Sequence, residues 1–192
     1  MDPARGILPL ALSEATDEQR RLMGPWSDMH FAAVYANHPG LYRVVMPLIK
    51  QVVVDSTLPT RDREILLFRT LHLCEDVYES THHREIARSA GMTDVEIDAA
   101  RTGEGLSGFH ATLANAAEQL VRHQRVGDET WRELGERYRQ AQMMEVVALV
   151  GTYVLIAMST RTFGIAIEDD ETFRGFMDKR DYLPRERGTA RG

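Results

Sequence analysis

Apolar residues recur at spacings of three and four along almost the whole chain, and this period constrains the fold more than any other feature. A helix with that spacing buries one apolar face, whereas a half-buried strand would alternate apolar and polar residues. Alternating segments are hard to find. With 43% apolar residues in 192, the chain can bury one core. The pattern therefore predicts an all-α, single-domain helical bundle of about seven to eight helices.

Helix ends are marked by capping residues and by glycine or proline. Asp76, followed three residues later by Glu79, is an acidic version of a capping box, and Gly91 suits the left-handed residue that follows a helix. Thr93 or Asp94 caps a further short helix. The other expected helices cover 17–37, 41–54, 61–73, 76–90, 109–125, 129–139 and 143–163.

The expected organisation is an N-terminal extension over 1–16, a helical domain over 17–170 and a loose, arginine-rich tail over 171–192. The last long helix is apolar nearly all round, which fits either a central core position or a subunit interface. Its longest apolar run, 146–158, is shorter than the roughly 18 residues that a membrane span needs, so we expect a buried helix and no membrane.

Composition excludes some classes of function. The net charge of -6 argues against nucleic-acid binding, which normally needs a basic face. Cys74 is the single cysteine, so neither an intrachain disulfide nor a multi-cysteine metal site can form, and a reducing compartment is expected. The acidic N-terminus has no long apolar core, so it is not a secretory signal. We therefore expect a cytoplasmic protein.

One short stretch, CEDVYESTHH at 74–83, gathers most of the candidate site residues. Glu79 and His83 are four apart and share a helix face, which Ala87 and Gly91 continue with almost no side chain. This face lets another helix come close and leaves room beside the imidazole. Its structural alternatives are a satisfied core position for His83 and a capping role for Glu79.

A second face of the same helix carries Tyr78 and His82. Tyr78 is explained equally by packing, and His82 is expected on the solvent side. Cys74 lies just ahead of the helix, where the positive helix end favours a thiolate if the site is open. The alternative for Cys74 is a small buried apolar group. Glu64 is explained equally by its position in the first turn of its helix.

Three blocks resemble the carboxymuconolactone decarboxylase family, relatives of alkylhydroperoxidase D. The resemblance covers about residues 30–167 and lies in the spacing of Glu64, the Tyr78–Glu79 pair and His83. It implies an all-α fold and homo-oligomers, commonly trimers or hexamers. The blocks are LPTRDREILLFRT, YESTHHREIARSAGMTDVEI and WRELGERYRQAQMMEVVALVGTYVLIAMSTRTFGI.

The peroxidase branch of this family has a glutamate, eleven residues, then C-x-x-C-x-x-x-H. Here Glu64, Asp76, Glu79 and His83 occupy those places, so both cysteines are replaced by carboxylates. A carboxylate cannot form or resolve a sulfenic acid, which excludes two-cysteine peroxidase chemistry. One-cysteine activity at Cys74 is left as a weak alternative.

The remaining pair resembles the decarboxylase branch, whose prototype uses neither a metal nor an organic cofactor. The resemblance implies that His83 is a general acid/base that Glu64 orients, with Glu79 as a third candidate. The residues expected to contact a substrate are Tyr78, His82, Trp26 and Cys74.

The expected substrate is a small carboxylated lactone, keto acid or enone that undergoes decarboxylation or isomerisation. Ser80 stands where many relatives have tryptophan, and the N-terminal extension brings in Trp26 and His30, so the pocket wall differs from theirs. The competing hypothesis is a non-catalytic, ligand-binding or interaction member of the family.

Overall fold

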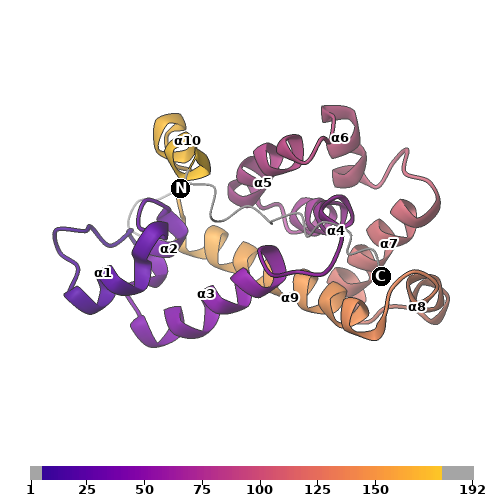
Figure 1. Ribbon diagram of the computed structural model, residues 1–192, viewed down its shortest axis with the longest axis horizontal. Coiled ribbons are helices and arrows are strands. Elements are labelled where there is room, and N and C mark those ends of the chain that lie inside the picture. Colours follow the sequence, from indigo (N-terminus) through magenta and orange to yellow (C-terminus); the bar gives the residue numbers. More distant parts are fainter. Residues whose placement is uncertain (1–5, 179–192) are drawn as a thin grey trace, which may run out of the picture.

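The computed structural model describes residues 6–178, and every regular element in that range is helical (Figure 1). The all-α prediction is confirmed. Ten α-helices and one 3-10 turn are present in these residues, more than the seven or eight expected. They are α1 (Asp17–Met23), η2 (Gly24–Trp26), α2 (His30–Tyr35), α3 (Pro39–Val53), α4 (Thr60–Leu73), α5 (Val77–Ser89), α6 (Asp94–Thr102), α7 (Gly108–His123), α8 (Asp128–Gly135), α9 (Gln140–Phe163) and α10 (Asp170–Asp178).

The segment expected as one helix over 17–37 is divided into α1, η2 and α2. Gly24 ends α1 with a positive φ of 48°, and Pro25 follows without an amide hydrogen to continue the helical ladder. The chain therefore turns at Gly24, which brings Trp26 to the wall of the cavity described below.

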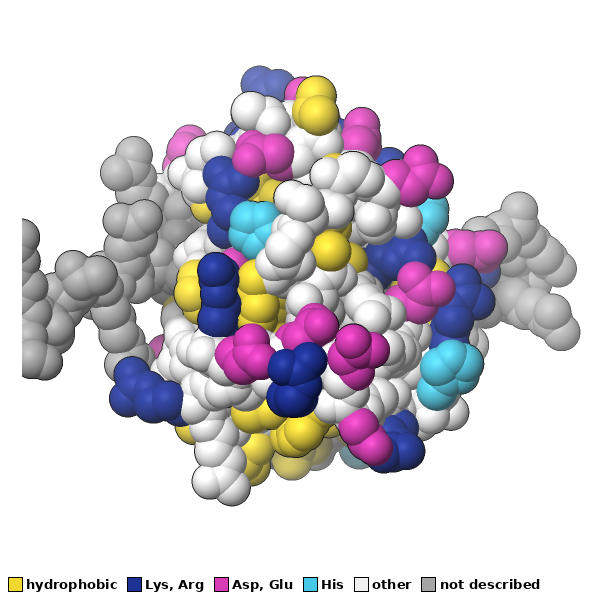
Figure 2. All heavy atoms as spheres, turned by 90° about the vertical axis from the view of Figure 1, so that its right-hand side faces the viewer, with side chains coloured by type: hydrophobic (Ala, Val, Ile, Leu, Met, Phe, Trp, Pro, Cys, Tyr) yellow, Lys and Arg dark blue, Asp and Glu magenta, His cyan; other side chains and the backbone are white. Residues whose placement is uncertain are grey.

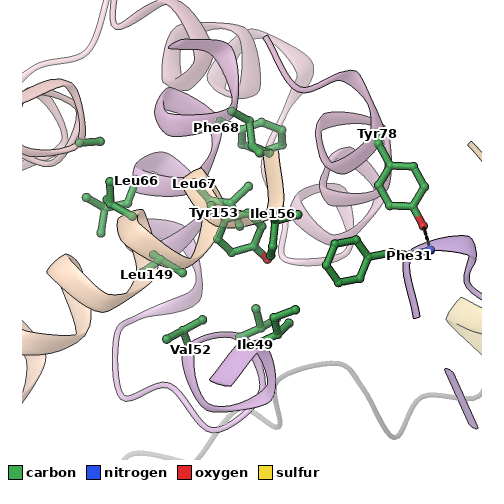
Figure 3. Packing of buried hydrophobic residues seen from close by; sticks show 14 of the residues in the cluster. Phe31, Ile49, Val52, Leu66, Leu67, Phe68, Tyr78, Leu149, Tyr153 and Ile156 are labelled. Atoms are coloured by element: carbon green, nitrogen blue, oxygen red, sulfur yellow. Dashed lines mark hydrogen bonds between the residues drawn. The ribbon is translucent and has the colours of Figure 1, made fainter. Parts of the chain in front are cut away.

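Helix α4 is the centre of the bundle and packs against α5, α6, α7 and α9. Helix α9 runs along the length of the molecule and also packs against α3 (Figure 1). Figure 3 shows Tyr153 and Ile156 of α9 between Phe68 of α4 and Ile49 of α3. The core thus joins α3, α4 and α9, and α5 lies against α4 at its edge.

Helix α9 has 24 residues, which is longer than the apolar run 146–158 suggests, and its length and composition alone would allow it to cross a membrane. Of its most apolar 18-residue window, 56% is buried inside the protein. A core helix of a helical bundle has the same properties, so the length of α9 is weak evidence for a span.

Asp76 caps α5, as expected, and also ties that helix to α9. Its Oδ1 accepts the Glu79 amide hydrogen at 3.2 Å, and its Oδ2 accepts the Thr160 hydroxyl at 3.0 Å. The reciprocal half of the predicted capping box is absent, because the Glu79 side chain lies near His83 instead. Gly91 adopts the expected left-handed conformation, with φ 80°.

The prediction of a loose tail from residue 171 is wrong for residues 171–178, which belong to α10. This helix packs through aromatic rings: Phe176 lies 5.2 Å from Trp26 and Phe173 lies 4.4 Å from His82, centroid to centroid. An amphipathic helix of nine residues was overlooked among the charged residues of this segment. Residues 179–192 of the predicted tail and 1–5 of the predicted extension lie outside the described residues.

Figure 2 shows the end of the molecule formed by α6, α7 and α8. Dark-blue and magenta side chains are mixed over this face, and several form local ion pairs such as Arg132 with Glu136 and Arg125 with Asp128. Exposed pairs of this kind contribute little to stability. Their mixture gives this face no extended patch of one charge.

Replacement of Asp76 by alanine is expected to destabilise the fold by about 2 kcal/mol or more, because it removes a helix cap and a buried contact to α9. Thr93→Ala removes the more exposed cap of α6 and is expected to cost about 1 kcal/mol. Urea denaturation of both variants measures the difference. Equal losses would contradict the second role of Asp76.

Candidate active site

A partly open cavity of about 80 Å³ lies where α3, α5, α9 and α10 meet the segment that holds η2 and α2. Its wall is mainly apolar, with five polar side chains on α5 and α9. The apolar lining residues are Trp26, Met29, Phe31, Ala32, Met46, Ile49, Val53, Ile86, Ile156, Phe173, Phe176 and Met177, and the polar ones are Tyr78, Glu79, His82, His83 and Tyr153.

A buried chain of polar groups begins behind this cavity at Arg63. The guanidinium of Arg63 donates to Oε1 of Glu64 at 2.9 and 3.2 Å and to the Val53 carbonyl at 2.8 Å. Oε2 of Glu64 lies 2.9 Å from Nδ1 of His83, and Nε2 of His83 lies 2.7 Å from the Tyr153 hydroxyl. The structure therefore brings Glu64 and His83 together, and adds Arg63 and Tyr153.

The ionised state of Glu64 determines the direction of the hydrogen bonds between Glu64, His83 and Tyr153. Burial alone would raise the pKa of Glu64, but the His83 ring and the Arg63 guanidinium outweigh burial and lower it. An ionised carboxylate only accepts hydrogen bonds, so Nδ1 of His83 donates to Glu64. In the neutral imidazole, Nε2 then accepts from the Tyr153 hydroxyl.

Tyr153 was not predicted as a site residue, because its segment looks like a uniformly apolar core helix. The one feature of the sequence that could have identified Tyr153 as a site residue is its polar hydroxyl within the apolar run 146–158. Burial, with the charges of Glu79 and Glu64, raises the pKa of Tyr153 well above its ordinary value. Tyr153 is therefore a neutral hydrogen-bond donor between His83 and the cavity.

Glu79 lies on the cavity side of His83, with its Oε2 3.7 Å from Nε2. Burial raises the pKa of Glu79 to about 8, and the negative charges of Asp76 and Glu168 add to this effect. At neutral pH the side chain is mainly protonated, so it can donate a hydrogen bond. Glu79 is thus placed as an acid next to His83.

The prediction that His82 faces solvent is wrong, because its residue is 4% exposed. It lies beside a second buried carboxylate, Glu168, which sequence reasoning missed. Glu168 accepts the Tyr78 hydroxyl at 2.6 Å and the His30 amide hydrogen at 2.5 Å. Burial would raise the pKa of Glu168, but contacts with His82 and Tyr78 lower it.

The structure does not bring Cys74 to the cavity. This residue ends α4, and its carbonyl accepts from Arg161 at 2.7 Å. Burial and the charge of Asp76 raise the pKa of the half-buried thiol, against the expectation of a favoured thiolate. In residues 6–178, no group of three or more His, Cys, Asp or Glu side chains is placed to hold a metal ion.

The fold is of the alkylhydroperoxidase D type. The chain resembles the crystal structure of an uncharacterized peroxidase-related protein with an alkylhydroperoxidase AhpD core, from Ralstonia eutropha JMP134. The two are 16% identical, with a TM-score of 0.72 over 87% of this chain and 95% of that one. This likeness shows the fold alone.

Residues 39–121 match the carboxymuconolactone decarboxylase family. A comparison with curated proteins found no match. The matched segment contains Glu64, Glu79 and His83, whereas Tyr153 and Glu168 lie beyond its end. The cavity is therefore completed by residues outside the family segment.

The pKa of Glu79 predicts a specific pH dependence of stability. Because this pKa is raised from 4.5 to about 8 in the folded protein, the folded state holds the proton more tightly than the unfolded state. Between about pH 5 and 8, Glu79 is ionised in the unfolded state but still mainly protonated in the folded state. The free energy of unfolding should therefore fall as pH rises through this range, by up to about 1.4 kcal/mol per pH unit.

Glu79→Gln is expected to remove this slope, since an amide does not titrate in this range. Urea denaturation at several pH values between 5 and 8.5 measures it for both proteins. Glu129→Gln, at an exposed position of α8, is the matched control and should keep the slope of the original protein. Parallel curves for all three proteins would contradict the protonated state of Glu79.

Proposed function

We propose that this protein is a cofactor-independent proton-transfer enzyme, of lyase or isomerase type, acting on a small carboxylated lactone, keto acid or enone. One observation carries the proposal: His83 is held at both ring nitrogens, by Glu64 and Tyr153, at the wall of a mainly apolar cavity. Fixed imidazole geometry and a dry surrounding both favour proton transfer to and from carbon.

The reaction class follows from what each group can do. Loss of a proton or of carbon dioxide next to a carbonyl leaves negative charge on the carbonyl oxygen, which needs hydrogen-bond donors. The protonated Glu79 carboxyl is such a donor on the cavity wall. When His83 carries a second proton, its Nε2 donates to Tyr153 and frees the hydroxyl hydrogen for the cavity, while Glu64 keeps the ring oriented.

The cavity also limits the substrate. Its volume of about 80 Å³ suits only a compact molecule, and Trp26, Phe173 and Phe176 close it on the α10 side. Aromatic and aliphatic walls favour a largely apolar body with one or two oxygen-bearing groups. The proposed lactones, keto acids and enones have this composition.

A non-catalytic, ligand-binding role is the second candidate, and the same cavity supports it. Its favouring observation is that neither nitrogen of His83 is free to contact a ligand directly. The thiol alternative has little support, because Cys74 lies away from the cavity and its thiol pKa is raised.

We also propose a cytoplasmic homo-oligomer, a trimer or hexamer, in which α9 contributes to the contact between copies. Apolar residues at helical spacing are exposed along α9, including Met144, Val147, Leu155 and Met158. Val44 of the neighbouring α3 adds to the exposed apolar surface. Exposed apolar surface of this kind is typical of protein interfaces.

His83→Asn is expected to lower proton transfer by at least about 100-fold, because it removes the acid/base group. The assay is exchange of C–H protons for deuterium, followed by NMR, with small lactones, keto acids and cyclic enones as probes. His123→Asn, at an exposed site of α7, is the control. Equal exchange in His83→Asn and the original protein would exclude a catalytic His83.

Ligand binding is measured separately by a melting-temperature screen with the same compounds. A ligand at one hundred times its dissociation constant adds about 2.7 kcal/mol to stability. Stabilisation without exchange would support the binding role.

Met158→Glu is expected to reduce the oligomer to smaller species, since it puts a charge on the proposed contact. Val95→Glu, at an equally exposed apolar residue of α6, should not change the assembly. Size-exclusion chromatography with light scattering measures both. A monomeric original protein would contradict the proposed oligomer.

A further inference from the structure

The two adjacent histidines of α5 both line the cavity, but their ring nitrogens are occupied differently. Nδ1 of His83 faces Glu64 and Nε2 faces Tyr153, so His83 has no nitrogen left for a ligand. Nε2 of His82 lies 2.8 Å from Oε2 of Glu168. Nδ1 of His82 makes no hydrogen bond to another residue of 6–178, and it keeps some accessible surface although the residue as a whole is 4% exposed.

The contact with Glu168 determines which nitrogen of His82 carries a hydrogen. The contact is short but not aligned as a linear hydrogen bond, and it is attractive only if Nε2 carries the hydrogen, because an ionised carboxylate is an acceptor. Nδ1 is then the basic nitrogen of the neutral ring. His82, which lines the cavity, therefore has a ring nitrogen that can take up a proton.

Neighbouring contacts hold this arrangement in place. Tyr78 packs edge-on to the His82 ring at 4.4 Å and donates its hydroxyl hydrogen to Glu168, and Figure 3 shows the same hydroxyl accepting from the Phe31 amide. Phe173 of α10 stacks on the ring at 4.4 Å. Both rings fix the plane of His82, and both line the cavity.

We propose that His82 is a second catalytic residue, which takes a proton from a C–H bond of the bound compound at Nδ1 and returns it, while Glu168 acts as its positioning residue. This inference rests on the proposed function. It assigns the direct contact with substrate to His82 and leaves His83 to act through Tyr153.

The step balances without any co-reactant. The C–H bond breaks, its proton forms an N–H bond at Nδ1, and the electron pair delocalises onto the carbonyl oxygen, to which the protonated Glu79 donates a hydrogen bond. The proton then returns to the same carbon, which gives exchange, or to a conjugated carbon, which gives the isomer. In a decarboxylation Nδ1 instead first takes the proton of the substrate's carboxyl group. The C–C bond then breaks with release of carbon dioxide, its electron pair delocalises onto the carbonyl oxygen, and the cationic His82 returns the proton to that carbon.

The charges around His82 suit this cycle. The neutral ring becomes a cation when it takes the proton, and the ionised Glu168 beside it stabilises that cation. The other titratable groups near the pair are Tyr78, Glu79 and His30, of which His30 has its Nδ1 3.9 Å from Glu168. Tyr78 and Glu79 are neutral at pH 7, so Glu168 is the negative charge next to the ring.

The first test reads the hydrogen positions in the unsubstituted protein and needs no substrate. Long-range ¹H–¹⁵N NMR of histidine-labelled protein at pH 8.5 should show His82 as the tautomer with hydrogen on Nε2, and His83 as the one with hydrogen on Nδ1. In Glu168→Gln, His82 should no longer show a single tautomer, whereas His83 should keep its hydrogen on Nδ1. A hydrogen on Nδ1 of neutral His82 would overturn the proposal.

The second test is deuterium exchange into cyclohex-2-enone and the other carbonyl probes. His82→Asn should lower exchange by at least about 100-fold, and Glu168→Gln by about 10-fold, with His123→Asn unchanged. Melting-temperature shifts caused by the probes should persist in His82→Asn, which separates lost chemistry from a lost site.

The outcomes separate this proposal from the one on which it rests. Exchange that His83→Asn abolishes and His82→Asn leaves intact would overturn the role of His82 and keep the proposed function. No exchange by the original protein with any probe would overturn both.

Discussion

The ion pair between Arg63 and Glu64 is the interaction on which the rest of the structure depends. Both side chains are almost fully buried, 1% and 0% exposed, at the centre of the bundle. Such a pair is tolerated only if its remaining hydrogen-bonding atoms are satisfied, because the loss of hydration costs several kcal/mol per ion. Arg63 meets this condition through the Val53 carbonyl at the end of α3. Oε2 of Glu64 meets it through His83, so α5 must present that ring to α4.

The same requirement explains why the core and the candidate site share their residues. Satisfaction of Glu64 places His83 between α4 and α9, and Tyr153 of α9 then satisfies the second ring nitrogen. His82, one residue earlier, projects about 100° away around the helix and meets a carboxylate from a different part of the chain. The cavity lies where these two arrangements meet, and α10 closes it with aromatic rings.

Periodicity and capping residues were sufficient to predict the fold class, the start of α5 at Asp76 and its end before Gly91. The resemblance to the carboxymuconolactone decarboxylase family was sufficient to nominate Glu64 and His83. Tyr153 and Glu168 could not be nominated, because they approach α5 from 70 and 86 residues further along the chain. Nothing local distinguishes a core tyrosine from one that contacts a buried histidine.

Errors at the site have a common physical cause, which is burial that the sequence does not reveal. His82 was expected on the solvent side, yet α10 covers the helix face that carries Tyr78 and His82. Glu79 was nominated both as a cap and as a site residue, and its burial beside His83 removes only the capping role.

The two positions that resemble the cysteine pair of the peroxidase motif, Asp76 and Glu79, have separate tasks here. Asp76 stabilises the start of α5 and its contact with α9 through two accepted hydrogen bonds. Glu79 lies nearer His83, where burial and neighbouring charge keep it protonated at neutral pH. A thiol at that position could give up electrons, whereas a protonated carboxyl can only donate or accept a proton. The same backbone frame, with these two replacements, therefore lacks the two thiols of the peroxidase motif and has a protonated carboxyl at the cavity wall.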